Sequence, residues 1–138
     1  EITSKTKVII PTHLNGSSAN IPAIKKIIKK KKIYIIEDAA QALFSKNKKK
    51  YLGTIGDIGC FSLSIPKALT AGQGGFCCTN SKKIYEKLKI IKTQGMRDVF
   101  FSKWNTLGFN FKFNDISASV CYDQFVKYKS VVNRFKKI

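Results

Sequence analysis

Short apolar runs that stop abruptly at a turn-forming or charged residue constrain the fold of this chain more than any other feature. Four runs have the length of strands, at residues 7–10, 33–36, 59–64 and 75–79. The run at 33–36 reads Ile-Tyr-Ile-Ile and changes at once to an acidic pair, which predicts a buried strand with polar groups at its end. We therefore expect a sheet of several short strands.

Amphipathic stretches lie between and after these strands. Asn20, Ser81 and Asn114 can each cap a helix, because their side chains accept hydrogen bonds from N–H groups of the first turn. The last helix is predicted to turn six side chains inward: Ile116, Val120, Phe125, Tyr128, Val132 and Phe135. Strands alternating with helices indicate an α/β fold in which at least part of the sheet is parallel. In such sheets the chemistry lies beyond the carboxyl ends of strands.

The chain carries 26 lysine and arginine residues against 8 acidic residues, a net charge of +18. This charge permits a basic nucleic-acid-binding module, because such residues neutralise phosphates. However, only Arg97 and Arg134 are arginines, the residue type favoured for bidentate recognition of phosphate or guanine. Lysine runs at 29–32 and 48–50 coincide with a predicted helix end and a predicted turn. We therefore favour a solvated basic surface and expect no nucleic-acid partner.

The cysteines and the single histidine exclude several kinds of site. Cys60, Cys77, Cys78 and Cys121 form no C-x-x-C pair, and His13 alone cannot complete a zinc cluster. We predict no metal site and no disulfide framework, with the cysteines as small apolar residues in a reducing compartment. Cys77 and Cys78 are neighbours in a predicted strand, so their side chains are expected on opposite faces. His13 is interpreted as a hydrogen-bonding anchor of a strand-end turn.

The chain is expected to be one segment, residues 1–138, of a larger protein. It starts at Glu1, and Met96 is its only methionine. No apolar run approaches the roughly 20 residues that span a bilayer, and the first residues lack the apolar region of a secretory signal. We therefore expect a cytoplasmic protein with no membrane partner.

One lysine stands apart from the other basic residues. Lys67 is the only charged residue between Asp57 and Lys82. A lysine among apolar neighbours loses hydration of its charged form, which favours the neutral amine as a nucleophile or a base. The isolation of Lys67 makes it a candidate catalytic residue.

Asp38 and a glycine-rich turn are the other candidates. Asp38 follows a fully apolar strand, and taken alone it is best explained as a helix N-cap. Glycines at positions 72, 74 and 75 allow the backbone to approach a ligand closely, although taken alone they favour a plain turn. Neither segment is decisive by itself.

Three motifs occur in a recognisable order: Glu-Asp-Ala-Ala-Gln at 37–41, Phe-Ser-x4-Lys at 61–67 and Gly-x-Gly-Gly at 72–75. With segments 10–16, 53–59, 93–96, 108–112 and 115–118, this order resembles the DegT/DnrJ/StrS family of sugar aminotransferases, including perosamine-synthase-like members. These are pyridoxal 5′-phosphate (PLP) enzymes. The resemblance implies an α/β fold that is part of the large PLP-binding domain of the aspartate-aminotransferase fold type (fold type I), with a mostly parallel sheet flanked by helices. The N-terminal part of that domain and a C-terminal small domain would be absent.

The resemblance also assigns roles to residues. Lys67 matches the lysine that holds PLP covalently as a Schiff base and, once released, carries a proton between carbon atoms. Asp38 matches the carboxylate paired with the pyridine nitrogen, which it keeps protonated. Ala40 matches a residue that packs on the ring face.

Three further positions complete the implied PLP site. Gln41 matches a residue that hydrogen-bonds the ring's 3′ oxygen, and Ser62 matches a phosphate-binding hydroxyl. Asn110 matches an asparagine that reaches the phosphate from a neighbouring subunit. The resemblance therefore implies a homodimer with a shared active site.

The sequence departs from the family pattern at two positions of these motifs. Gln73 stands where many members have glutamate, and Ala68 replaces a commoner polar or bulky residue after the lysine. Dehydratases of the family carry histidine in place of the lysine, so Lys67 argues against that chemistry.

The resemblance implies a transaminase that moves an amino group from an amino acid, expected to be glutamate, to a nucleotide-linked keto-deoxysugar. The product would be an aminosugar for polysaccharide or a secondary metabolite. The alternatives are a non-catalytic PLP-binding regulator of the same fold and the nucleic-acid-binding module.

Overall fold

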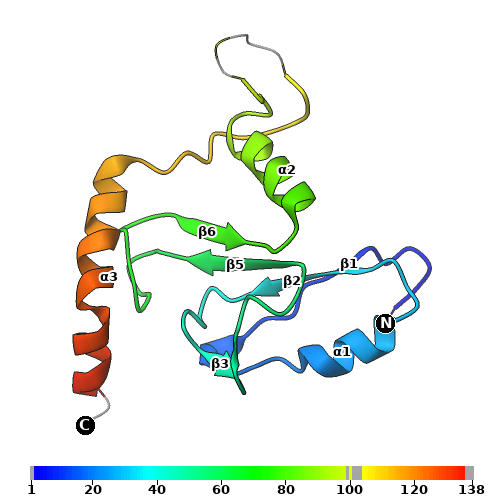
Figure 1. The fold of residues 1–138 in the computed structure, drawn as a ribbon, viewed down its shortest axis with the longest axis horizontal. Coiled ribbons are helices and arrows are strands. Elements are labelled where there is room, and N and C mark those ends of the chain that lie inside the picture. Colours follow the sequence, from blue (N-terminus) through cyan, green and yellow to red (C-terminus); the bar gives the residue numbers. More distant parts are fainter. Residues whose placement is uncertain (1, 99, 101–103, 136–138) are drawn as a thin grey trace.

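The centre of the molecule is a mixed four-stranded sheet with the strand order β1-β2-β5-β6 (Figure 1). A computed structural model describes residues 2–98, 100 and 104–135 of the chain. The strands of the sheet are β1 (Val8–Ile9), β2 (Tyr34–Asp38), β5 (Ile58–Ser62) and β6 (Gly75–Cys78). β2 pairs in parallel with both β1 and β5, whereas β5 and β6 are antiparallel. The four predicted strands are thereby confirmed, and so is the parallel part of the sheet.

Each predicted helix begins where its capping residue indicates. The helices are α1 (Ile21–Ile28), α2 (Lys82–Lys92) and α3 (Asp115–Phe135). The side chains of Asn20, Ser81 and Asn114 each accept a hydrogen bond from the backbone N–H three residues further on. This bond satisfies one of the N–H groups that a helix start leaves without a partner.

Two short elements complete the structure. A single turn of 3-10 helix, η1 (Leu14–Gly16), follows β1. A hairpin of β3 (Lys46–Asn47) and β4 (Lys50–Tyr51) lies between β2 and β5, and it was not predicted. Its turn contains Lys48, with a φ of +54°, and Lys49, so the turn predicted for the lysine run at 48–50 is present, although Lys50 lies in β4. No helix in the described part of the chain is both long and apolar enough to cross a bilayer.

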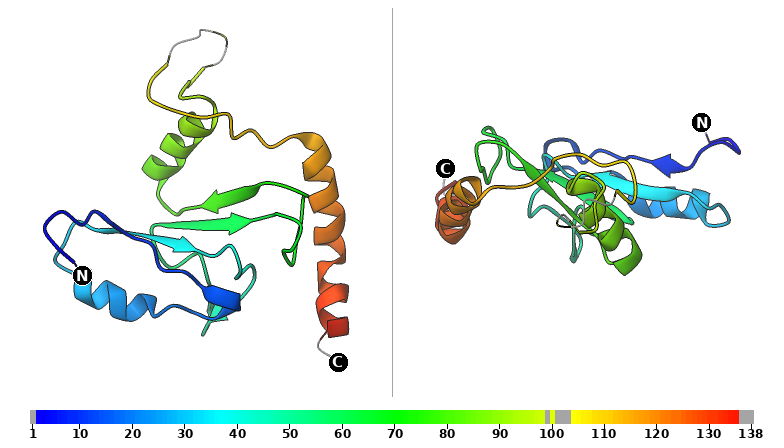
Figure 2. Two further views of the ribbon diagram at one scale, coloured as in Figure 1. Left: turned by 180° about the vertical axis from the view of Figure 1, so that it is seen from behind. Right: turned by 90° about the horizontal axis from the view of Figure 1, so that it is seen from above.

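The carboxyl ends of β2 and β5 point toward the same end of the sheet. α3 runs across this end, whereas α1 lies at the opposite side of the molecule (Figures 1 and 2). α3 is joined to the loop after β5 by Gln124, whose Oε1 accepts a hydrogen bond from the Thr70 N–H. Tyr128 of the same helix packs its ring 4.4 Å from that of Phe44, between centroids.

The predicted inward face of α3 is wrong for three of its six residues. Ile116, Val120 and Phe125 are exposed, and Ile116 retains 80% of its accessible surface. Tyr128 and Val132 are half-buried, whereas the side chain of Phe135 lies outside the described part of the structure. Periodicity identifies the apolar side of a helix, but it does not determine whether another element covers that side.

The buried carboxylate of Glu37 holds two turns against β2 by hydrogen bonds. Glu37 is fully buried in β2, and its Oε2 accepts hydrogen bonds from His13 Nε2 at 2.8 Å and from the Gly53 N–H at 3.0 Å. Its Oε1 accepts from the backbone N–H groups of Ile55 and Gly56. Four donors on two separate segments therefore converge on one side chain.

His13 is the anchor that the sequence predicts, and the hydrogen bonds assign its tautomer. Its ring is fully buried, and Nδ1 accepts a hydrogen bond from the Ala19 N–H at 3.1 Å. The ring proton therefore lies on Nε2, which donates to Glu37. Both ring nitrogens have protein partners, which is the arrangement of a structural histidine.

The hydrogen bonds to Glu37 also determine its ionisation. Burial by itself raises the pKa of Glu37, but the bonds from Gly56, His13, Gly53 and Ile55 outweigh burial and hold that pKa below its ordinary value of 4.5. The carboxylate thus stabilises the fold above pH 4.5, and this contribution is lost as the pH falls through the lower, folded-state pKa.

We predict that Glu37→Gln lowers the free energy of unfolding at neutral pH by about 2–4 kcal/mol, because it leaves buried N–H groups without an acceptor. The difference from the wild type should shrink as the pH falls from 4.5 through the lower folded-state pKa, because the unfolded wild-type chain takes up the proton before the folded one does. Urea denaturation at a series of pH values measures both effects. The control is Glu86→Gln, in an exposed pair with Lys89, which should change stability by less than about 0.5 kcal/mol. Equal effects of the two variants would contradict the role of Glu37.

Candidate active site

A pocket of about 500 Å³ opens where the three parallel strands end. Its lining includes Asn15 from the turn after β1, Ala40 and Gln41 from the turn after β2, and Ser62 and Lys67 from the end of β5 and its loop. This is the location at which α/β sheets bind ligands. The structure therefore brings together four of the six predicted site residues: Ala40, Gln41, Ser62 and Lys67.

Lys67 lies half-buried in the loop that joins β5 to β6. Its backbone N–H donates to the Ser64 carbonyl at 3.1 Å, which closes a tight turn around Pro66. The same turn places two hydroxyls together, because Ser62 Oγ and Ser64 Oγ lie 2.9 Å apart. The pocket is thus lined by a residue with a primary amine, Lys67, and by Ser62, whose hydroxyl lies against that of Ser64.

Gln41 is oriented by the turn that follows β1. Its Oε1 accepts a hydrogen bond from the Asn15 N–H at 2.9 Å, so its NH₂ group is the end that remains available to a ligand. Asn15 itself has a φ of +51°, a left-handed conformation that asparagine tolerates. Asn15 is not among the site residues predicted from the sequence. Its position in segment 10–16, one of the segments that resemble the family, could have indicated it.

Asp38 ends β2 but is not among the residues that line the pocket. Its Oδ1 accepts a hydrogen bond from the Ala40 N–H at 3.1 Å, and residues 39–45 form turns rather than a helix. The helix N-cap reading of Asp38 is therefore wrong. Oδ2 has no hydrogen-bond partner within the described residues.

Asn110 is not brought to this pocket. It is exposed, and its backbone forms an antiparallel bridge with Thr93 at the end of α2. Its Oδ1 accepts from the Lys112 N–H at 3.5 Å. Within one chain, Asn110 therefore lies apart from the group formed by Gln41, Ser62 and Lys67.

Thr70 shapes the loop that carries Lys67, and sequence reasoning missed it. Its Oγ1 donates to the Leu63 carbonyl at 3.1 Å and accepts from the Gly72 N–H at 2.9 Å. Gly72 has a φ of +79°, and Gly74, with a φ of +116°, leaves no room for a Cβ beside the Phe113 ring. Both glycines are therefore required by the backbone conformation of the turn, as the sequence indicates when the motif is taken alone.

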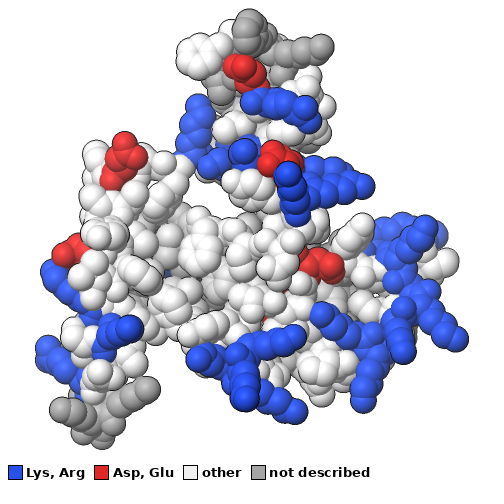
Figure 3. Space-filling model, viewed as in Figure 1, with Lys and Arg blue, Asp and Glu red and all other residues white. Residues whose placement is uncertain are grey.

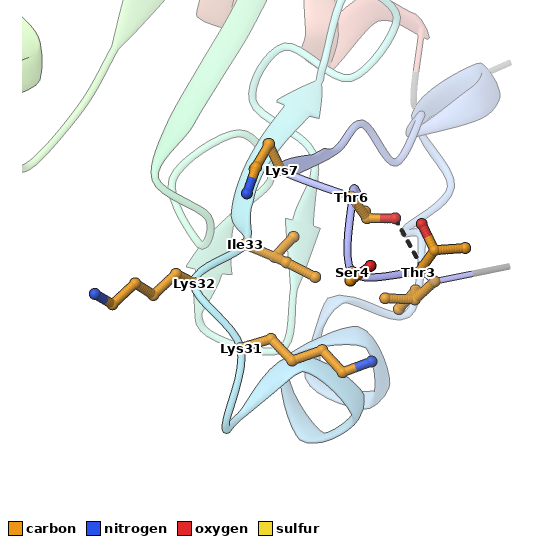
Figure 4. A pocket seen from close by; sticks show the side chains of 8 residues that line it. Thr3, Ser4, Thr6, Lys7, Lys31, Lys32 and Ile33 are labelled. Atoms are coloured by element: carbon orange, nitrogen blue, oxygen red, sulfur yellow. Dashed lines mark hydrogen bonds between the residues drawn. The ribbon is translucent and has the colours of Figure 1, made fainter.

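A second hollow, of about 470 Å³, lies beside the start of β1 (Figure 4). Its lining includes Thr3, Lys7, Lys31 and Ile33, and the Thr3 N–H donates to Thr6 Oγ1 within it. It contains none of the predicted site residues. We therefore place the candidate active site in the pocket at the strand ends.

On one face of the molecule, the charged side chains lie away from the centre of the sheet (Figure 3). On the face shown in Figure 3, lysine and arginine side chains gather over α1 and around the hairpin, whereas the surface over β5 and β6 carries little charge. Among the described residues, no group of three or more histidine, cysteine or acidic side chains has the arrangement of a metal site.

We predict that Thr70→Val destabilises the protein by about 1–3 kcal/mol, because the Gly72 N–H loses its acceptor and the Leu63 carbonyl keeps only the hydrogen bond from the Ala71 N–H. Thr70→Ser retains both hydrogen bonds and is the matched control. Hydrogen exchange should quicken at Gly72 in the valine variant alone. A serine variant that exchanges as fast as the valine variant would show that the hydroxyl does not hold this loop.

Comparison with known proteins agrees with this geometry. The chain is 35% identical over 139 residues to a GDP-perosamine synthase of Escherichia coli O157:H7, and the match covers 100% of this chain and 38% of that protein. It is 36% identical over 120 residues to a pleiotropic regulatory protein of Geobacillus stearothermophilus, covering 86% of this chain and 32% of that protein. The chain thus spans well under half the length of these curated relatives.

A solved structure has the same fold. It is the PLP-form of the putative sugar aminotransferase Spr1654 from Streptococcus pneumoniae, with a TM-score of 0.88 and 27% identity, covering 99% of this chain and 40% of that one. The expected fold class, an α/β fold that forms part of a fold type I PLP-binding domain, is thereby confirmed. The model of one family matches residues 1–138, the whole of the chain. The chain belongs to the DegT/DnrJ/EryC1/StrS aminotransferase family.

Proposed function

We propose that the protein is a PLP-dependent aminotransferase that moves an amino group from an amino acid, glutamate in the first instance, to a nucleotide-linked keto-deoxysugar. The observation that carries this proposal is the convergence of Lys67, Ser62 and Gln41 on one pocket at the ends of the parallel strands. Membership of a sugar aminotransferase family and the similarity to a GDP-perosamine synthase support the substrate class.

The donor set of the pocket fits the functional groups of PLP. An amine suits its aldehyde, hydroxyls suit its phosphate, and an amide NH₂ suits its phenolic oxygen. Lys67 Nζ would bind the aldehyde carbon covalently, and Ser62 Oγ, with Ser64 Oγ beside it, would donate to the phosphate. Gln41, held by Asn15, would donate from its NH₂ group to the phenolic oxygen. These residues fix the orientation of the cofactor by three separate contacts.

Two residues would control protons. Oδ2 of Asp38, left available by the bond from Ala40 to Oδ1, would hold the proton on the pyridine nitrogen. The free Lys67 amine would be the base that takes a proton from the donor's Cα and carries it to its new position. When bound, the cofactor supplies the electron sink that makes the Cα proton acidic. Ala40, which lines the pocket with a methyl group, leaves room for a flat ring.

Asn110 is proposed to act on a second subunit. It is exposed and lies apart from the pocket of its own chain, as a residue that serves a neighbouring site would. We therefore propose a homodimer whose two sites each take Asn110 from the partner.

We predict that Lys67→Ala abolishes covalent attachment of PLP. The full-length protein, incubated with PLP and reduced with borohydride, should carry the label on the peptide that contains Lys67, and peptide mapping by mass spectrometry locates it. Lys49→Ala, in the exposed hairpin turn, is the matched control and should label as the wild type does. A label that persists in the Lys67→Ala variant on another residue would refute the assignment.

The second candidate function is that of a regulator that binds PLP without catalysis. The similarity to a protein named as a pleiotropic regulatory protein favours this function. A regulator of this kind would keep the residues that hold the cofactor, as an enzyme would. Labelling of Lys67 does not separate the two functions.

Transfer of nitrogen does separate them. We predict that the full-length protein moves ¹⁵N from labelled glutamate to a GDP-linked 4-keto-6-deoxysugar, detected as an aminosugar nucleotide by mass spectrometry. Lys67→Ala should give no labelled product. A protein that is labelled at Lys67 but transfers no nitrogen to GDP-, UDP- or dTDP-linked ketosugars would favour the regulator.

A further inference from the structure

Two cysteines face each other across the antiparallel strands β5 and β6. Cys60 and Cys77 are directly opposed in the strand register, and their Sγ atoms lie 3.7 Å apart. Both are free thiols. The function proposed above uses neither of them.

The ladder position of this pair brings the two backbones close. The Leu63 N–H donates to the Gly74 carbonyl, so Leu63 and Gly74 form a hydrogen-bonded pair of the antiparallel ladder. Hydrogen-bonded and non-hydrogen-bonded pairs alternate along the ladder, which puts Cys60 and Cys77 in the non-hydrogen-bonded class, with Cα atoms about 4.5 Å apart. That separation lies within the range that a disulfide spans, and closure needs the sulfurs to approach to about 2.05 Å.

The other two cysteines of the chain lie elsewhere. Cys78 points to the opposite face of β6, where its thiol donates to the Gly53 carbonyl at 3.1 Å. Cys121 is on α3, packed against the cluster of Leu63, Leu69 and Ala71. Neither belongs to the Cys60–Cys77 contact, so both serve as internal controls.

The two thiols of the pair differ in their surroundings. Cys77 is exposed, so a small oxidant can reach it. Burial, and after it the neighbouring Cys77 and the Asp38 carboxylate, together raise the pKa of Cys60 to about 12. Cys77 is therefore the thiol that reacts first, and Cys60 is the one that completes the bond.

We propose that Cys60 and Cys77 form an oxidation-sensitive dithiol that hydrogen peroxide closes to a disulfide. The Cys77 sulfur attacks one peroxide oxygen, the O–O bond breaks, and the displaced oxygen takes the thiol proton and leaves as water. The Cys60 sulfur then attacks the Cys77 sulfenic acid; the S–O bond breaks, and the hydroxyl leaves with the Cys60 proton as a second water. The peroxide is reduced by two electrons, and the dithiol is oxidised by two.

The crosslink would form beside the candidate active site. Cys60 is opposite Asp38 in the parallel register of β2 and β5, so the new bond would lie one strand away from that carboxylate. It would tie β6 to β5 at this point. The modification requires no cofactor, so its test is independent of the proposed aminotransferase function.

The test uses the full-length protein, reduced, freed of reductant and exposed to hydrogen peroxide. Remaining thiols are alkylated, and the protein is digested with trypsin without reduction. Cleavage after Lys50, Lys67 and Lys82 gives peptides 51–67 and 68–82, which hold Cys60 and the Cys77–Cys78 pair. We expect these peptides to be joined, to be two hydrogens lighter than their sum, and to separate with dithiothreitol. Of the four cysteines in residues 1–138, two should escape alkylation.

Three results would overturn the proposal. The first is a disulfide that still forms in the Cys77→Ser variant or is lost in the Cys78→Ser variant. If a variant does not fold, fragmentation of the linked wild-type peptides between Cys77 and Cys78 shows which of the two carries the disulfide. The second is oxidation of Cys77 to sulfinic acid without a link. The third is a link that joins heavy and light peptides when ¹⁵N-labelled and unlabelled proteins are oxidised together, because it would then form between chains.

Discussion

The buried carboxylate of Glu37 is the interaction on which the rest of this structure depends. A buried charge is tolerated only where hydrogen bonds replace its hydration, and Glu37 has four donors on two turns that are distant in sequence. The turn at 53–56 also lies close to the backbone of β5, since a Cβ on Gly59 would fall 1.8 Å from the Gly53 carbonyl oxygen. Satisfying this one group therefore packs the 53–56 turn and the His13 turn against β2.

The same arrangement places the candidate site. Side chains alternate along a strand, so Glu37 and Asp38 leave β2 on opposite faces. With Glu37 anchored to His13, the turn after β1 is held where Asn15 can donate to Gln41. On the other side, Thr70 ties the Lys67 loop to the end of β5 and, through Gln124, to α3. The pocket is thus a set of loops whose positions are determined by hydrogen bonds formed outside it.

Local chemistry made much of the fold predictable. Helix starts follow from single side chains that accept a hydrogen bond three residues away, and strands follow from short apolar runs, so Asn20, Ser81, Asn114 and the run at 33–36 identify their elements without tertiary information. The β3–β4 hairpin lacks such a signal, because its strands are two residues each and rich in lysine. The exposed side of α3 could not be predicted, because exposure depends on what packs against Ile116 and Val120, not on their spacing.

The sequence by itself determined the three helices, the four strands of the main sheet, the family and the chemical types of the site residues, since motifs and capping residues act over a few positions along the chain. Only the tertiary structure decided which of those residues meet. It joins Gln41, Ser62 and Lys67 in one pocket, because parallel strands carry residues distant in sequence to the same edge of the sheet. It separates Asn110 from them, and it places Cys60 against Cys77, because strand register depends on pairing between segments and is not encoded by either segment alone.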